Sequence, residues 1–158
     1  MKIAFKLNGK ETSIDVALDR RVVDLLREDL GLTGTKESCA AGDCGACTIL
    51  VDGETRLSCL MLAAQLEGRN ITTIEGFANG DHLHPVQAAF VEHGAVQCGF
   101  CTPGMILAST DLLKRNPSPS RDEIRAGLSG NLCRCTGYQM IVDAVHEAAE
   151  KSREGQDS

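Results

Sequence analysis

Hydrophobic and polar residues alternate at the start of the chain. Apolar side chains occupy every second position in residues 3–7 and again in residues 14–16, which is the spacing of a strand with one buried face. The dipeptide Asn8-Gly9 between the two segments is typical of a two-residue hairpin turn. The pattern therefore predicts a β-hairpin over residues 2–17.

The pattern changes several times over the rest of the first half. Apolar positions recur at helical spacing in residues 21–30 and predict a short helix, whereas residues 31–47 have no sustained period and carry four glycines, as expected of a long functional loop. Residues 48–51 and 54–58, separated by an Asp-Gly dipeptide, predict a second hairpin. Residues 60–67 predict a short helix and residues 71–74 a final strand. We therefore expect a small α+β unit.

The second half of the chain has only helical patterns. Residues 76–83 carry turn residues without a period, which places a domain boundary there. Four helices are predicted after it: Pro85–His93, Thr102–Arg115, Ser120–Leu128 and Gly137–Ser152. We expect an α+β domain at residues 1–76, a linker at 77–83, and a four-helix bundle at 84–158 that ends in a short polar tail.

Composition and charge exclude several functions. The chain has 158 residues and a formal net charge of −6, with no long run of Lys or Arg, so nucleic acid and membrane surfaces are poor candidates for partners. No segment has the pattern of a secretory leader or a membrane span, and we expect a soluble, cytoplasmic protein. Only 3 % of the residues are aromatic, whereas eight are cysteines. In a reducing cytosol, so many cysteines indicate metal ligation or catalysis rather than disulfides.

Four cysteines in the first half follow the spacing C-x4-C-x2-C-x11-C: Cys39, Cys44, Cys47 and Cys59. This spacing is typical of a plant-type [2Fe–2S] site, in which one loop supplies three thiolates and a distant segment supplies the fourth. Glycines within the loop allow backbone N–H groups to approach the sulfur atoms. A four-thiolate zinc site usually has two short knuckles. Only one knuckle is present here, so the spacing favours iron and sulfur over zinc.

The four cysteines in the second half follow the spacing C-x2-C-x31-C-x-C: Cys98, Cys101, Cys133 and Cys135. Each pair precedes a predicted helix, whose N-terminal N–H groups and dipole stabilise thiolates and anionic clusters. From spacing alone, this set fits either zinc or a [2Fe–2S] cluster. Zinc would make the chain a structural module, whereas two iron–sulfur clusters would make it an electron carrier.

Other motifs that carry chemistry are missing from the sequence. We find no P-loop, no dinucleotide-binding glycine motif and no convincing nucleophile with its base, so no catalytic residue is assigned. The histidines are expected to be structural because both cysteine sets are complete without them: His82, His84, His93 and His146. Three residues next to cysteines are candidates for tuning contacts: Thr48, Thr102 and Arg134, although a surface ion pair explains Arg134 more simply. Tyr138 is expected near the second cysteine set or at a subunit contact.

The segments around the cysteines resemble one known family. The runs Gly42–Thr48, Cys98–Met105 and Gly130–Tyr138 are similar to the small iron–sulfur subunit of the xanthine dehydrogenase, or molybdenum hydroxylase, family. The likeness extends over about residues 2–150. It implies an N-terminal β-grasp, plant-type ferredoxin-like domain with one [2Fe–2S] cluster and an all-α four-helix-bundle domain with the other. It therefore favours iron at the second set.

The same resemblance implies a place in a larger enzyme. A large subunit would carry a molybdenum–pterin cofactor, a medium subunit would usually carry FAD, and the complex would be a dimer of heterotrimers. Electrons would leave molybdenum singly, pass through the C-terminal and then the N-terminal cluster, and reach FAD or another acceptor. Gln97 and Cys98 would be the residues nearest the pterin. The chain would transfer electrons and have no substrate-converting site of its own.

Two other functions are compatible with the residues. A freestanding two-cluster ferredoxin would shuttle electrons between soluble partners, and a zinc-stabilised module would serve only in binding. Within the molybdenum hydroxylases, a purine or another N-heterocycle is the favoured substrate, and aldehydes or carbon monoxide are the alternatives. The pocket that selects the substrate would lie on another polypeptide.

Overall fold

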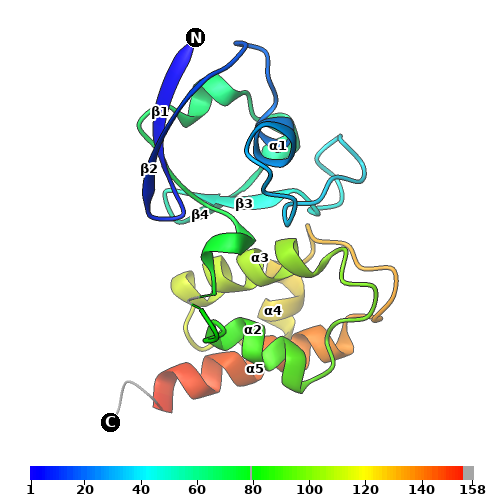
Figure 1. The fold of residues 1–158 in the computed structure, drawn as a ribbon. Helices are drawn as coiled ribbons and strands as arrows, with labels where there is room; N and C mark the ends of the chain where they lie inside the picture. Colours follow the sequence, from blue (N-terminus) through cyan, green and yellow to red (C-terminus); the bar gives the residue numbers. More distant parts are fainter. Residues whose placement is uncertain (79, 155–158) are drawn as a thin grey trace.

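The computed structural model describes residues 1–78 and 80–154. The first half forms a five-stranded mixed sheet with the strand order β2-β1-β5-β3-β4 (Figure 1). The strands are β1 (Lys2–Leu7), β2 (Lys10–Asp15), β3 (Thr48–Val51), β4 (Glu54–Leu57) and β5 (Asn70–Thr72). β1 and β5 run parallel, and the other neighbouring pairs are antiparallel. The mixed sheet with helices confirms the predicted combination of α and β structure.

Both predicted hairpins are confirmed, and local turn chemistry explains them. Asn8 and Gly9 have φ values of 48° and 82°, and Asp52 and Gly53 have φ values of 53° and 84°. Two left-handed residues in succession are what a type I′ turn requires, and Asn-Gly and Asp-Gly adopt that conformation most readily. The turns therefore fix the register of β1 with β2 and of β3 with β4.

The helix predicted over residues 21–30 is irregular. It begins as α1 (Val22–Asp24) and continues as a π-helical turn, η1 (Leu25–Asp29), in which the Leu30 N–H donates to the Leu25 carbonyl at 3.0 Å. Leu25 and Leu26 are both fully buried in the core of the sheet. The wider turn keeps both side chains inside, and tertiary packing thus overrides regular helical spacing.

The helix predicted over residues 60–67 is not present. The segment forms two 3₁₀ turns instead, η2 (Ser58–Leu60) and η3 (Ala63–Leu66). The residues between them are extended because their backbone pairs with residues 20–22, through hydrogen bonds of 2.8 Å from Val22 N to Met61 O and from Ala63 N to Arg20 O. β5 ends at Thr72, and residue 74, which was predicted as the end of the last strand, instead begins a 3₁₀ turn (η4, Ile74–Gly76).

All four predicted helices are present: α2 (Pro85–Glu92), α3 (Thr102–Arg115), α4 (Arg121–Gly127) and α5 (Gln139–Glu154). α5 begins two residues later than predicted because Gly137 and Tyr138 have left-handed φ values of 65° and 71°. Residue 79 of the predicted linker and residues 155–158 of the predicted tail lie outside the described residues. No helix in the described ranges is long and apolar enough to cross a membrane.

Each half has its own apolar core, and α3 joins the two. Phe5 lies in the core of the sheet half, and Phe90 lies in the core of the helical half. Figure 1 shows α3 directly beneath the sheet, and this helix packs against β3 and β4. Asp111 of α3 accepts hydrogen bonds from the N–H of Thr55 at 3.2 Å and from its hydroxyl at 2.9 Å. The halves are therefore joined by polar contacts as well as by packing.

Candidate functional site

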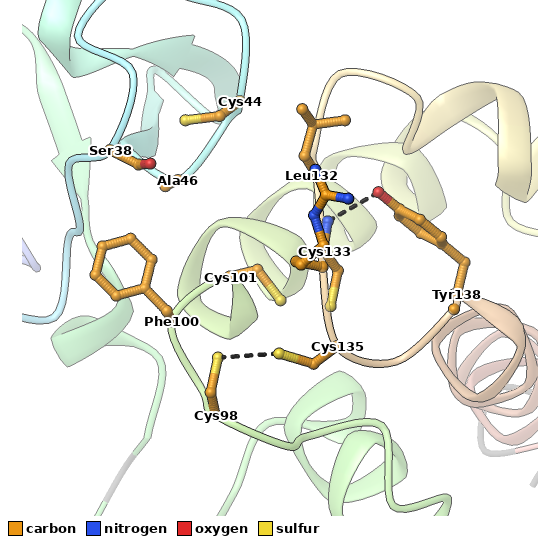
Figure 2. Close-up of a pocket in the computed structure, with 12 residues that line it drawn as sticks. Ser38, Cys44, Ala46, Cys98, Phe100, Cys101, Leu132, Cys133, Cys135 and Tyr138 are labelled. Carbon is orange, nitrogen blue, oxygen red and sulfur yellow. Dashed lines mark hydrogen bonds between the residues drawn. The ribbon is translucent and has the colours of Figure 1, made fainter.

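The cysteine-bearing loops of the two halves meet on one side of the molecule. Figure 1 shows the loops of residues 31–47, 94–101 and 128–138 on that side. An open pocket of about 560 Å³ lies between them. Five cysteines from both halves line it: Cys44, Cys98, Cys101, Cys133 and Cys135 (Figure 2). All eight cysteines of the chain are free thiols, so each can serve as a metal ligand.

The loop of the first set is shaped to hold an anionic sulfur at Cys39. Its Sγ accepts three backbone N–H groups, from Ala41 at 3.4 Å, Asp43 at 3.3 Å and Cys44 at 3.4 Å. These hydrogen bonds, with that from Ala41 the strongest, lower the pKa of Cys39 to about 6. Gly42, with a φ of 85°, makes the tight path possible. The backbone N–H groups, together with the neighbouring Cys44 thiol, thus favour the thiolate form that a metal binds.

The other two thiols on the sheet side are buried together. Cys47 and Cys59 have exposed fractions of 2 % and 4 % and pack against Val23 of α1. The hydroxyl of Ser58 donates to the Cys47 carbonyl at 2.7 Å and so ties the start of β3 to the end of β4. Burial, followed by the neighbouring Cys47, raises the pKa of Cys59 to about 11. A metal that binds here must displace protons from thiols held close together.

The four thiols of the helical half converge on one space. Figure 2 shows their side chains directed toward one another, with the sulfur atoms of Cys98 and Cys135 3.6 Å apart. Burial, followed by contact with Cys133, raises the pKa of Cys101 to about 12. Burial opposes ionisation of Cys133 as well, but hydrogen bonds from Thr136 outweigh it and lower the pKa of that thiol.

The thiols of both sets are arranged in pairs. The pairs are Cys39 with Cys44, Cys47 with Cys59, Cys98 with Cys135, and Cys101 with Cys133. Within the described ranges, no three His, Cys, Asp or Glu side chains are close enough to hold a single metal ion. A [2Fe–2S] cluster has two protein ligands on each of its two irons. Two pairs of thiols in each half fit that requirement.

Two residues that the sequence prediction assigned no definite role hold Cys133. The hydroxyl of Thr136 donates to the Cys133 Sγ at 3.1 Å, and the Thr136 N–H donates to the same atom at 3.4 Å. The phenol oxygen of Tyr138 accepts the Cys133 N–H at 2.8 Å (Figure 2). Thr136 directly follows Cys135, as the tuning candidates Thr48 and Thr102 directly follow Cys47 and Cys101. The same signal could have identified it.

The three tuning candidates from the sequence have different environments. The hydroxyl of Thr48 donates to the Gly45 carbonyl at 2.7 Å and therefore supports the first loop. The hydroxyl of Thr102 is buried and has no hydrogen-bond partner in the described part of the chain. Arg134 lines the pocket between the two halves.

Three of the four histidines contact protein groups, and His82 is exposed. His84 caps α2 by accepting the Val86 N–H at 3.3 Å, and His93, at the C-terminal end of α2, pairs with Glu147 of α5. His146 lies 3.7 Å from Glu150 on the same helix. Gln97 and Cys98 lie on the exposed surface of the loop before α3.

Asn131 connects the two loops that carry the cysteine sets. Its side-chain Nδ2 donates to the Gly45 carbonyl at 3.0 Å and to the Thr48 hydroxyl at 3.2 Å. The backbones of the two loops are also close, since a Cβ at Gly45 would overlap the Gly130 oxygen. The sequence gives no local signal for this contact because it joins residues 86 positions apart.

Two protein families match the chain, one in each half. Residues 5–73 match the family described as 2Fe-2S iron-sulfur cluster binding domain, and residues 73–146 match the family described as [2Fe-2S] binding domain. Each match contains one complete set of four cysteines. They agree with the assignment of iron to the first set and resolve the ambiguity between iron and zinc at the second.

Individual relatives cover the chain almost completely. It is 50 % identical over 149 residues to the nicotinate dehydrogenase small FeS subunit of Eubacterium barkeri, with 94 % of this chain and 95 % of that protein covered. A chain of quinoline 2-oxidoreductase from Pseudomonas putida 86 superposes with a TM-score of 0.94 at 50 % identity, covering 98 % of this chain and 97 % of that one. Aldehyde oxidoreductase from Desulfovibrio gigas also gives a TM-score of 0.94, at 41 % identity, covering 98 % of this chain but 17 % of that one. The fold thus occurs both as a separate chain and as part of a longer one.

Proposed function

The chain belongs to the family of small iron–sulfur subunits of molybdenum hydroxylases, and on this premise we propose that it relays electrons between the other components of such an enzyme. The observation that carries the proposal is the arrangement of eight free thiols in two sets of two pairs. Each bound [2Fe–2S] cluster supplies one-electron redox chemistry. The chain itself is an oxidoreductase subunit without a substrate-converting site.

We divide the chain into two cluster-binding domains. Residues 1–76 form a β-grasp, plant-type ferredoxin-like domain, residues 77–83 a linker, and residues 84–158 a four-helix-bundle domain with a short polar tail. The separate apolar cores of the two halves support this division. So do the two family matches, which meet at residue 73.

The ligands follow from the pairing of the thiols. The first cluster is held by Cys39, Cys44, Cys47 and Cys59, and the second by Cys98, Cys101, Cys133 and Cys135. Backbone N–H groups at Cys39 and the Thr136 hydroxyl at Cys133 stabilise the thiolate forms. The buried surroundings of Cys47 and Cys59 exclude water from the first site.

The partners of this chain lie next to its two cysteine sets. A large subunit with a molybdenum–pterin cofactor binds next to Gln97 and Cys98, because both residues are exposed. Phe100 and Leu132 line the pocket between the two halves and are 44 % and 53 % exposed. Such exposure is typical of apolar side chains that a partner covers. A medium subunit with FAD completes the enzyme at the side of the first set, and the assembly is a dimer of heterotrimers.

The substrate of the complex is an N-heteroaromatic compound, a purine or a relative of one. Two similar proteins support this class, since they are named for nicotinate and quinoline. The aldehyde oxidoreductase of Desulfovibrio gigas favours aldehydes as the second candidate. The residues that select the substrate lie on the large subunit, so this chain has the same task in either case.

The proposal is tested on the full chain after anaerobic reconstitution with iron and sulfide. We expect about four iron atoms per chain, from two clusters of two irons each, and two distinct EPR signals after reduction with dithionite. Cys44→Ser should remove one signal and Cys133→Ser the other. A colourless protein that binds stoichiometric zinc would overturn the proposal. Purification from native extract as a lone 16.9 kDa chain that retains both clusters would favour the freestanding carrier instead.

A further inference from the structure

Thr136 and Tyr138 enclose Cys133 in a closed ring of hydrogen bonds. The Cys133 N–H donates to the Tyr138 phenol oxygen at 2.8 Å, and the Tyr138 N–H donates to the Thr136 hydroxyl at 3.2 Å. The Thr136 hydroxyl in turn donates to the Cys133 Sγ at 3.1 Å. Since the Thr136 oxygen accepts from Tyr138, its one proton is free to point at the sulfur. The ring therefore fixes the direction of that hydroxyl.

An unusual backbone conformation makes this ring possible. Gly137 and Tyr138 have φ values of 65° and 71° in succession. A left-handed conformation is unfavourable for tyrosine because of its Cβ, and it persists only where the surroundings determine it. At Tyr138 it brings the phenol back over the loop that contains its hydrogen-bond partner, Cys133 (Figure 2). The strained residue thus serves the geometry at Cys133.

We propose that the Thr136 hydroxyl raises the reduction potential of the second cluster by donating to its ligand Cys133, and that Tyr138 positions both groups. The proposal rests on the assignment of Cys133 as a ligand in the proposed function. Thr136 and Tyr138 are positioning residues in this role and take no part in bond making.

The physical reason lies in the charge on the sulfur atom. Reduction adds one electron and no proton, so the negative charge on the thiolate sulfur increases while the Thr136 proton stays on its oxygen. A hydroxyl that points at the sulfur is therefore a better donor to the reduced form than to the oxidised form. Hydrogen bonds to sulfur are among the properties that set cluster potentials. Loss of the hydroxyl is expected to make reduction less favourable.

The first cysteine set provides an internal comparison. In the described part of the chain, Cys133 alone among the thiols accepts a hydrogen bond from a side-chain hydroxyl. Cys39 accepts backbone N–H groups and a contact from the Cys44 thiol, but no side-chain hydroxyl within the described residues. A change at Thr136 should therefore act on one cluster and leave the other as an internal reference.

The test is an EPR-monitored redox titration of the full chain, reconstituted with both clusters. Thr136→Val removes the hydroxyl and keeps the shape of the side chain. We expect it to shift the reduction equilibrium of one cluster about tenfold toward the oxidised form, which is about 59 mV for a one-electron couple, and to leave the other unchanged. Thr136→Ser keeps a hydroxyl at this position and should have the reduction potential of the wild type.

Thr110→Val is the matched control. The Thr110 hydroxyl donates to the Ile106 carbonyl within α3 at 2.9 Å and contacts no cysteine, so its removal should move neither potential. Tyr138→Phe removes the acceptor for the Cys133 N–H. We expect a smaller shift of the same cluster in the same direction, with faster loss of its iron to a chelator.

Each remaining outcome also decides the proposal. Equal potentials for Thr136→Val and the wild type, or equal shifts for Thr136→Val and Thr136→Ser, would overturn it. If Thr136→Val fails to assemble the second cluster while Thr136→Ser succeeds, the hydroxyl is needed to hold the cluster rather than to set its potential, and the proposal is wrong. Failure of the wild type itself to bind two clusters would instead contradict the proposed function.

Discussion

The backbone N–H of Leu132 donates to the carbonyl oxygen of Cys44 at 2.8 Å. Cys44 belongs to the first cysteine set, and Leu132 directly precedes Cys133 of the second, so one hydrogen bond joins the ligand loops of the two halves. Asn131 adds side-chain bonds to the same loop. Because electron transfer between two centres requires them to be close and fixed, this contact connects the packing of the halves with the proposed function.

The first prediction concerns Asn131, which is 8 % exposed. Asn131→Leu keeps the branching of the side chain at Cγ but removes the donor to the buried Gly45 carbonyl and to Thr48. We expect a loss of about 1–3 kcal/mol in the free energy of unfolding, because buried polar groups lose their partner. Denaturant unfolding of the reconstituted chain measures this value. The exposed Asn70→Ala serves as the control and should change stability by less than about 0.5 kcal/mol; equal effects of the two variants would contradict the expectation.

The second prediction concerns the close approach of α3 to the first loop. A Cβ at Gly104 would lie 2.5 Å from the Gly45 oxygen and 3.2 Å from the Asn131 Nδ2. Gly104→Ala should therefore push α3 and the first loop apart and destabilise the chain by about 1–3 kcal/mol, as overpacking does. Thermal unfolding should show a lower Tm, and the EPR signals of both clusters should change. Gly130→Ala, where nothing lies within 4 Å of an added Cβ, should do neither. A normal Tm for Gly104→Ala would contradict a tight contact between α3 and the first loop.

The third prediction concerns the carboxylate between the halves. Asp111 has a side chain only 5 % exposed, and it pairs with Arg115 at 3.2 Å besides accepting from Thr55. Burial raises its pKa, but the hydrogen bonds from Thr55 and the contact with Arg115 together outweigh burial and hold the pKa below the usual 3.8. Asp111→Asn should cost about 1–3 kcal/mol at neutral pH, because a charged acceptor at this interface is lost.

The pH dependence of this difference has a defined sign. A carboxyl whose pKa is lowered on folding contributes stability above its unfolded pKa and loses it as the pH falls through its folded pKa. The difference in the free energy of unfolding between wild type and Asp111→Asn should therefore be constant from about pH 5 to 7. It should decrease under more acidic conditions, as measured by denaturant unfolding. Asp122→Asn, at a 94 % exposed carboxylate, is the control and should have almost no effect. A difference in the free energy of unfolding that increases in acid would contradict the lowered pKa of Asp111.

Local signals in the sequence predicted the parts of the fold that depend on a few neighbouring residues. Asn8-Gly9 and Asp52-Gly53 predicted two hairpins through their turn chemistry, and Ser120 predicted the start of α4 through its capping box. The π-helical turn at Leu25 was missed because it arises from packing against the sheet. The helix predicted at residues 61–62 was wrong because this segment pairs with residues 20–22 instead. No local pattern in the sequence indicates that pairing.

The candidate site also has a part that the sequence predicted and a part that it could not predict. Cysteine spacing predicted both ligand sets because ligands to one cluster must recur at positions that the loops can bring together. The contacts between the sets could not be predicted. The hydrogen bond from Leu132 to Cys44 uses backbone atoms, which every residue has. No local pattern around Asn131 indicates its distant hydrogen-bond partners. The tertiary structure alone reveals them.

The last prediction concerns the loop that surrounds Cys39. Gly42 has a φ of 85°, and an added Cβ would lie 2.6 Å from the Cδ1 of Leu60. Gly42→Ala therefore imposes a left-handed strain of about 1–2 kcal/mol, whereas the Leu60 side chain, which is 60 % exposed, can rotate away from the added Cβ. Relief of the backbone strain displaces the N–H groups that face the Cys39 sulfur. We expect reconstitution to give about half the normal iron, with the EPR signal of the first cluster lost and that of the second retained.

The matched control for this loop is Gly31→Ala. Gly31 has a similar left-handed φ of 68° but no atom within 4 Å of an added Cβ, and it lies outside the turn that holds Cys39. This variant has a similar backbone strain outside that turn, and it should bind both clusters. If Gly31→Ala lost the first cluster as completely as Gly42→Ala, general destabilisation of the sheet half would explain the result. Selective loss in Gly42→Ala would instead show that the shape of the loop around Cys39 determines whether the first cluster binds.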